Sequence, residues 1–188
     1  MYYNDFKDLK LSGLGLGCMR LPCIDGDDSR PDPQAVQEMV DYAMANGINY
    51  FDTARPYHGG KSELVLKEAL TSRYPRESYV LTNKLSPGHF EKQEDIRPLV
   101  MEQLRICGVE YFDFYLMHAL SAARIPHYRT TRAFEIAQEL KAGKNAVAFM
   151  LGNGQGNPFW HALGYQGSFK TGKPIKGALE LTAENGDQ

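Results

Sequence analysis

The sequence has few of the features that mark secreted, membrane or nucleic-acid-binding proteins. Its 188 residues contain three scattered cysteines (Cys18, Cys23 and Cys107), which fit neither a disulfide framework nor the paired spacings of a zinc or iron-sulphur site. No run of about 18 apolar residues occurs, and the N-terminal MYYNDFKDLK is too polar for the core of a secretory signal. We therefore expect a cytoplasmic protein with no membrane partner and no metal site.

The sequence also lacks a large excess of positive or negative charge. The 21 lysines and arginines nearly balance the 23 acidic residues, which gives a formal net charge of −2. This balance gives no electrostatic reason to expect nucleic acid as a partner. With 43% apolar residues, the chain can bury the core of an ordinary globular domain.

The sequence does contain a repeated order of strand and helix. The pattern predicts strands at residues 13 to 22, 48 to 54, 79 to 85 and 111 to 120, and helices at residues 32 to 47, 62 to 70, 95 to 107 and 131 to 142. Asp32 before Pro33 is typical of a helix start, and Gly47 and Gly108 are typical of helix ends. Four such units in a row indicate an α/β fold with a parallel sheet, open or curved, and helices packed outside it.

The pattern changes after residue 142. Residues 143 to 188 hold nine of the eighteen glycines, one strand-like run (AVAFML, residues 146 to 151) and little helical periodicity. We predict a Gly-rich tail of irregular structure.

Four ionisable side chains follow or end the predicted strands on one side of the sheet. Asp52, Tyr57, Lys84 and His118 all fall at the carboxyl ends of strands, where parallel α/β folds bind ligands. Each alone has an ordinary explanation, as a cap acid, a surface tyrosine, a solvated cation or a buried imidazole. Their clustering at one rim is what favours a catalytic role.

The four residue types together suit the reduction of a carbonyl group. A phenol is a weak acid at neutral pH, so Tyr57 as proton donor needs a nearby cation such as Lys84 to favour the phenolate. A carboxylate such as Asp52 would keep a buried lysine protonated. His118 could donate a hydrogen bond to the carbonyl oxygen as that oxygen gains negative charge. The hydride would have to come from a bound cofactor.

The motifs around these residues resemble the aldo-keto reductase family. FDTARPY (residues 51 to 57), HGGKSE (58 to 63), NK (83 to 84) and FDFYLMH (112 to 118) match that family in order and spacing. The resemblance implies a (β/α)8 barrel that transfers a hydride from NADPH, less often NADH, to an aldehyde or ketone. It also implies that Asp52, Tyr57, Lys84 and His118 form the catalytic set.

The first predicted strand extends the resemblance to the cofactor site. LGLGCMRLP (residues 14 to 22) is similar to the first barrel strand of the family. By that match Gly17, Cys18 and Met19, together with Asp52, would border the nicotinamide. The sequences of these motifs are similar to those of a bacterial subgroup that often carries a C-terminal iron-sulphur domain. No cysteine cluster follows them in this sequence.

The resemblance ends near residue 142, whereas a complete barrel needs about 250 residues. We therefore expect a truncated, partial (β/α)8 TIM barrel: about four βα units in residues 1 to 142, then an irregular tail at residues 143 to 188. Impaired carbonyl reduction is one expectation. An inactive fragment that acts as an oligomer or a binding partner is the alternative, because open sheet edges favour self-association.

Two glycine-rich runs offer a weaker alternative. GLGLG (residues 13 to 17) and GNGQGNP (152 to 158) imitate a dinucleotide fingerprint, but neither has the full glycine pattern between a strand and a helix. A nucleotide-binding module at residues 152 to 157 is the third possible function.

Overall fold

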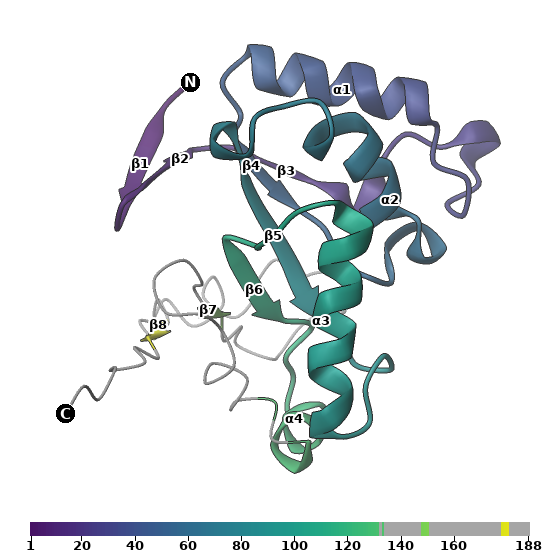
Figure 1. Cartoon of the computed structure of the whole chain (residues 1–188), viewed down its shortest axis with the longest axis vertical. Helices are drawn as coiled ribbons and strands as arrows, with labels where there is room; N and C mark the ends of the chain where they lie inside the picture. The colour runs from purple at the N-terminus through teal and green to yellow at the C-terminus, as the bar shows by residue number, and fades with distance from the viewer. Residues whose placement is uncertain (132, 134–147, 151–177, 181–188) are drawn as a thin grey trace, which may run out of the picture.

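The computed structural model describes residues 1–131, 133, 148–150 and 178–180 (Figure 1). The strands and α-helices, in chain order, are β1 (Tyr3–Phe6), β2 (Leu9–Ser12), β3 (Gly15–Gly17), α1 (Pro33–Ala45), β4 (Tyr50–Asp52), α2 (Ser62–Leu66), β5 (Val80–Leu85), α3 (Gln93–Cys107), β6 (Phe114–Met117), α4 (Ile125–Thr130), β7 (Ala148–Met150) and β8 (Ala178–Glu180).

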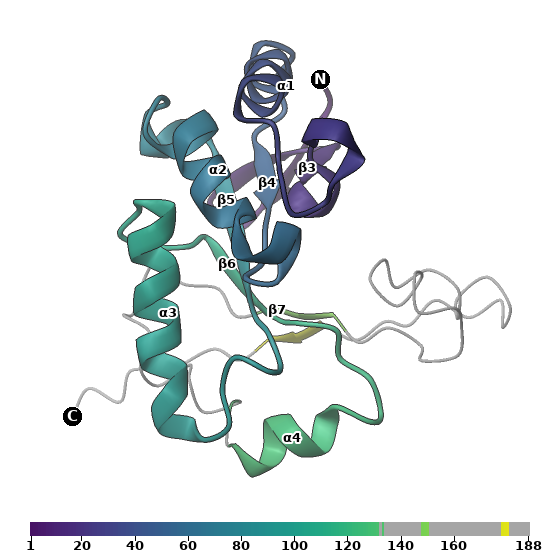
Figure 2. The same cartoon turned by 90° about the vertical axis from the view of Figure 1, so that its right-hand side faces the viewer.

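The centre of the fold is a four-stranded parallel sheet. Its strands lie in the order β3, β4, β5, β6, so each strand is hydrogen bonded to its neighbour in the sequence. The helices α1, α2 and α3 connect successive strands and gather along one face of the curved sheet (Figures 1 and 2). The prediction of an α/β fold with about four βα units is confirmed, and the curvature is that of part of a barrel.

The first helix forms where the sequence predicts it. Asp32 caps α1 by accepting hydrogen bonds from the main-chain N–H groups of the second and third helical residues, and Pro33 occupies the first helical position. Val36, Val40 and Ala43 form its buried face. These contacts fix α1 against the sheet.

The two faces of the sheet carry different side chains. Phe51, Leu81 and Leu85 are fully buried in the core that the helices cover. Because successive residues of a strand point to opposite faces, Asp52 and Lys84 lie on the other face, which corresponds to the inside of a barrel. The alternation therefore separates the apolar core from the candidate catalytic groups.

A two-stranded hairpin precedes the sheet, and sequence reasoning did not predict it. β1 and β2 pair antiparallel, with Phe6 opposite Leu9. The ring of Phe6 packs on that of Phe114 at the start of β6, with centroids 5.5 Å apart, and the main-chain N–H of Ser12 donates to Asn49 before β4. The hairpin thus lies at the amino ends of the strands, opposite the rim that carries Tyr57.

Several predicted elements are shorter than expected. The strand predicted at residues 13 to 22 pairs only at Gly15–Gly17, because β4 ends at Asp52, and the chain then forms a 3-10 turn at Cys18–Arg20. The helix at 62 to 70 begins as α2 and continues as one π-helical turn at Lys67–Thr71. The strand predicted at residues 111 to 120 is reduced to β6.

The end of the chain differs from prediction where it is described. α4 was not predicted, and the helix predicted at residues 131 to 142 falls almost wholly outside the described residues. The strand-like run AVAFML contributes β7, which pairs antiparallel with β8 and so does not continue the parallel ladder. The rest of the tail lies outside the described residues. None of the helices within the described ranges is long and apolar enough to span a membrane.

Candidate active site

Lys84 is the centre of the candidate site. Its ammonium group donates to the carboxylate of Asp52, to the main-chain carbonyl of Thr53 at 2.9 Å and to the hydroxyl of Tyr57 at 3.0 Å. A lysine ammonium has three donors, so all three are used. Because the Tyr57 oxygen accepts this bond, its own hydroxyl hydrogen remains available to a ligand.

Parallel pairing brings these groups together. Asp52 is in register with Thr82 on β5, and Lys84 follows Thr82 by two residues on the same face. Thr53 continues the pairing with a main-chain bond to the carbonyl of Thr82 at 2.9 Å. The side chain of Lys84 is only 10% exposed, so the ammonium is held largely out of water. Burial raises the pKa of Asp52, and Lys84 opposes that rise.

His118 completes the group of four at the end of β6. Its ring meets that of Tyr57 edge-on, with centroids 5.7 Å apart. Its Nδ1 lies 2.7 Å from the hydroxyl oxygen of Ser86, a buried residue directly after β5. Burial, and then the charges of Lys84 and Arg124, lower the pKa of His118 to about 4. The imidazole is therefore neutral at physiological pH.

This depressed pKa leads to a measurable pH dependence. We expect the His118 ring to titrate near pH 4 in the folded protein, against an ordinary value of 6.5. Between these two values the unfolded chain binds a proton that the folded chain does not, so stability should fall as the pH drops through that window and be unaffected above it. NMR titration of the ring proton would test this, with the signal assigned by its loss in His118→Gln. A midpoint near 6.5 would contradict the expectation.

A cavity of about 400 Å³ opens beside these residues. Tyr57 and His118 line it together, and Met19 and Ser86 form part of its walls. Loops that follow β3, β4, β5 and β6 all contribute, which is the usual position of ligand sites in parallel α/β folds. A ligand in this cavity would lie beside Tyr57 and His118.

The three residues predicted to border a nicotinamide lie at the end of β3 in different surroundings. Gly17 is exposed opposite Asp52, and a side chain there would meet open space. Met19 is half-buried and lines the cavity. Cys18 is fully buried in the core, and burial is the main cause that raises its pKa to about 12. Cys18 therefore lies beneath the surface and is not part of the cavity lining.

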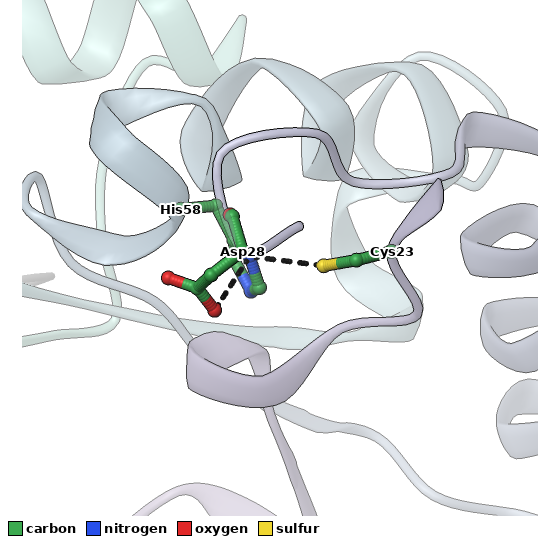
Figure 3. Close-up of side chains that lie close together, drawn as sticks. All are labelled: Cys23, Asp28 and His58. Carbon is green, nitrogen blue, oxygen red and sulfur yellow. Dashed lines mark hydrogen bonds and ion pairs between the residues drawn. The ribbon is translucent and has the colours of Figure 1, made fainter. Parts of the chain in front are cut away.

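A second cluster, of Cys23, Asp28 and His58 (Figure 3), shares Asp28 and His58 with the lining of the cavity. These are common metal-ligand types, and their ligand atoms lie within 4.8 Å of one another. However, the main-chain N–H of Leu21 donates to His58 Nε2 at 3.1 Å, which places the ring proton on Nδ1. Nδ1 then donates to the carbonyl of Asp28 at 2.9 Å, so it offers no lone pair to a metal. The cluster braces the loops after β3 and β4.

A buried polar network supports the opposite face of β5. The carboxylate of Glu63 on α2 is inaccessible to solvent and accepts from the side chains of Asn83 and Gln103, both at 2.9 Å. Asn83 Oδ1 accepts the main-chain N–H of Lys84 at 2.8 Å, and Gln103 donates to the Lys84 carbonyl at 3.2 Å. The guanidinium of Arg55 lies 3.1 Å from the second carboxylate oxygen. The network therefore holds the main chain of Lys84 on both sides.

The structure brings together all four residues predicted as catalytic and adds partners that sequence reasoning missed. Ser86 and the carbonyl of Thr53 contact His118 and Lys84 respectively. One signal could have indicated Ser86, because it directly follows β5 at the same rim as Lys84. The Thr53 carbonyl is a main-chain group, so residue type carries no signal for it.

Comparisons with known proteins indicate one family. The aldo/keto reductase family profile matches residues 13–145. The NADH-specific methylglyoxal reductase of Escherichia coli (strain K12) is 32% identical over 157 residues, which cover 72% of this chain and 46% of that protein. The NAD(P)H-dependent D-xylose reductase of Pachysolen tannophilus is 28% identical over 123 residues, or 62% of this chain and 33% of that protein.

A solved structure gives the same result for the fold. The holo form of aldo-keto reductase AKR11C1 from Bacillus halodurans superposes with a TM-score of 0.55 and 28% identity, over 76% of this chain and 48% of that chain. The chain spans less than half the length of these relatives. The profile match, the part-barrel sheet and the cluster around Lys84 lead to one conclusion: this chain belongs to the aldo-keto reductase family.

Proposed function

We propose that this site reduces an aldehyde or ketone with a nicotinamide dinucleotide, preferably NADPH. The observation that carries the proposal is the hydrogen bond from Lys84 Nζ to the Tyr57 hydroxyl oxygen, at 3.0 Å. It fixes the phenol oxygen beside a buried cation and leaves the phenol proton free to move to a substrate. Names of the relatives, which include NADH-specific and NAD(P)H-dependent reductases of small carbonyl compounds, support the reaction class.

In the proposed reaction Tyr57 is the proton donor. As negative charge develops on the substrate oxygen, Tyr57 would give its proton to that oxygen, and the adjacent Lys84 ammonium would stabilise the resulting phenolate. Asp52 would keep the ammonium charged. His118 would act as a neutral donor: if the Ser86 hydroxyl donates to Nδ1, the ring proton resides on Nε2 and can bond the same substrate oxygen.

The residues at the end of β3 fit a planar cofactor ring. Gly17 has open space where a side chain would project, and Met19 lines the cavity beside it. We propose that these two residues and Asp52 border the nicotinamide, with the buried Cys18 packed behind them. When bound, the cofactor would supply the hydride, which none of these side chains can provide.

Cofactor binding and turnover test the proposal directly. Purified protein would be titrated with NADPH and, separately, NADH while fluorescence is recorded, and carbonyl-dependent loss of reduced cofactor would be followed by absorbance. We expect saturable binding, tighter for NADPH, and turnover only when both cofactor and carbonyl are present. Absence of saturable binding of either nucleotide would contradict the proposal and favour a non-catalytic binding role.

Self-association through the sheet is a further expectation. β3 and β6 are the outer strands of the parallel sheet among the described residues, and β7 lies against β6, so β3 is the edge on which we base this expectation. Outer strands present unpaired main-chain groups that favour pairing with a second copy. We propose a concentration-dependent dimer, and sedimentation at several protein concentrations would detect it.

A further inference from the structure

Two arginines line the candidate cavity, and the proposed chemistry does not use them. Arg20 is the last residue of the 3-10 turn after β3, and Arg124 lies directly before α4. The two side chains therefore come from the loops that follow β3 and β6, the first and last strands of the parallel sheet. Both are exposed at the mouth of the cavity that Tyr57 and His118 also line.

Neither arginine is neutralised by a neighbour among the described residues. Arg20 donates one bond to the carbonyl of Met19 at 3.0 Å, and Arg124 donates one to the carbonyl of Ala119 at 3.3 Å. No carboxylate in the described ranges lies within ion-pair distance of either guanidinium. Because a guanidinium has five N–H donors in a planar fork, each keeps donors free for an anion.

The other charges around the cavity define the local field. The positive charge of Arg124 is among the causes that lower the pKa of His118, after burial and Lys84 and ahead of His89, so the guanidinium lies close to the catalytic groups. Lys84 is paired with Asp52 and adds little net charge. Asp28 also lines the cavity, with its side chain 65% exposed, and opposes the arginines. Two cations and one anion leave the rim positive.

We infer that Arg124, assisted by Arg20, forms an anion subsite that selects carbonyl substrates bearing a carboxylate. The carbonyl oxygen would lie at Tyr57 and His118, and the carboxylate would reach the guanidinium of Arg124 at the mouth. This inference rests on the proposed function for the identity of the reacting group. The subsite itself depends only on the position of the arginines, and the two can be tested separately.

A matched pair of aldehydes provides the test. para-Carboxybenzaldehyde and para-carbamoylbenzaldehyde have nearly the same shape and differ in charge. We expect kcat/KM to favour the carboxylate by about tenfold, as for a charge-assisted hydrogen bond at a partly solvated site.

Arg124→Gln should remove most of this preference and Arg20→Gln part of it. Asp28→Asn should increase it, because a repulsive charge is removed. Arg129→Gln, on an exposed residue of α4 outside the cavity lining, is the matched control.

Two further measurements do not depend on turnover. Calorimetry with each aldehyde in the absence of cofactor should show tighter binding of the carboxylate in the wild type and equal binding in Arg124→Gln. NMR titration should show a higher pKa for His118 in Arg124→Gln, because a nearby positive charge is lost.

The outcomes separate the subsite from the reaction. If both aldehydes are reduced equally well, or if the preference survives in both arginine variants, the anion subsite is refuted while the reductase stands. If neither aldehyde is reduced but the carboxylate binds in an Arg124-dependent manner, the proposed function fails and the subsite is supported. A preference that Arg129→Gln also abolishes would overturn the assignment to the cavity arginines.

Discussion

Tyr57→Phe should reduce kcat for carbonyl reduction by about 100-fold or more, the range expected when a positioned general acid is removed. The hydroxyl accepts from Lys84 at 3.0 Å and is the group placed to donate toward the cavity. Phenylalanine keeps the ring contacts, since Lys84 Nζ lies 4.7 Å from the ring centroid and His118 meets the ring edge. The decrease in kcat should therefore come from the missing proton donor and not from a change in structure. Steady-state kinetics at saturating cofactor would measure it.

The matched control is Tyr42→Phe. Tyr42 lies on α1 with 74% of its surface exposed and is not among the residues that line the cavity, so the loss of its hydroxyl should leave kcat unchanged. Cofactor affinity should be similar in both variants, because the Tyr57 hydroxyl acts on the substrate oxygen. A kcat for Tyr57→Phe within about threefold of the wild type would remove Tyr57 from the role of proton donor, since general acids contribute far more.

The candidate catalytic cluster could be predicted because its residues lie at positions that topology alone brings together. Asp52 ends β4, Lys84 lies near the end of β5 and His118 directly follows β6. Once four consecutive parallel strands are recognised, their carboxyl ends must meet at one rim. The sequence thus contains both the order of the strands and the place of each functional side chain on them. It contains no signal for Lys84 donating to a main-chain carbonyl, which depends on the bend after β4.

Local signals were less reliable at element ends. The sequence places Asp95 at the start of the third helix, whereas α3 begins at Gln93 and Asp95 is its third residue. There its carboxylate accepts the main-chain N–H groups of Glu91 and Lys92, at 2.9 and 3.1 Å. An acid can stabilise a helix start from the cap or from the third position, so residue type alone cannot distinguish the two.

Elements held by tertiary contacts could not be read from the sequence. All four residues of β1 are exposed, so the strand has no buried alternation to reveal it. Its position depends on contacts such as the hydrogen bond from Tyr3 to the carbonyl of Gly47. The partners of Glu63 come from β5 and α3, respectively 20 and 40 residues away in the chain. Pairing over such distances follows from the packed fold and not from local pattern.

The buried carboxylate of Glu63 leads to the largest expected effect on stability. In Glu63→Ala the side chains of Asn83 and Gln103 lose their shared acceptor, and the guanidinium of Arg55 loses its ion-pair partner. Breaking a buried charge network by removing one partner costs about 3–5 kcal/mol, because the remaining groups stay desolvated. We expect a loss of that size in the free energy of unfolding, measured by urea denaturation with the slope compared between variants.

Two further variants make this expectation decisive. Glu68→Ala removes an exposed carboxylate on the π-helical turn that follows α2, and should change the free energy of unfolding by less than about 0.5 kcal/mol. Glu63→Gln keeps the shape and one acceptor oxygen but loses the charge opposite Arg55, so its loss should be intermediate. If Glu63→Ala does not fold, Glu63→Gln still reports on the network. Equal stabilities for Glu63→Gln and Glu68→Ala would show that Glu63 is not needed to brace the strand that carries Lys84.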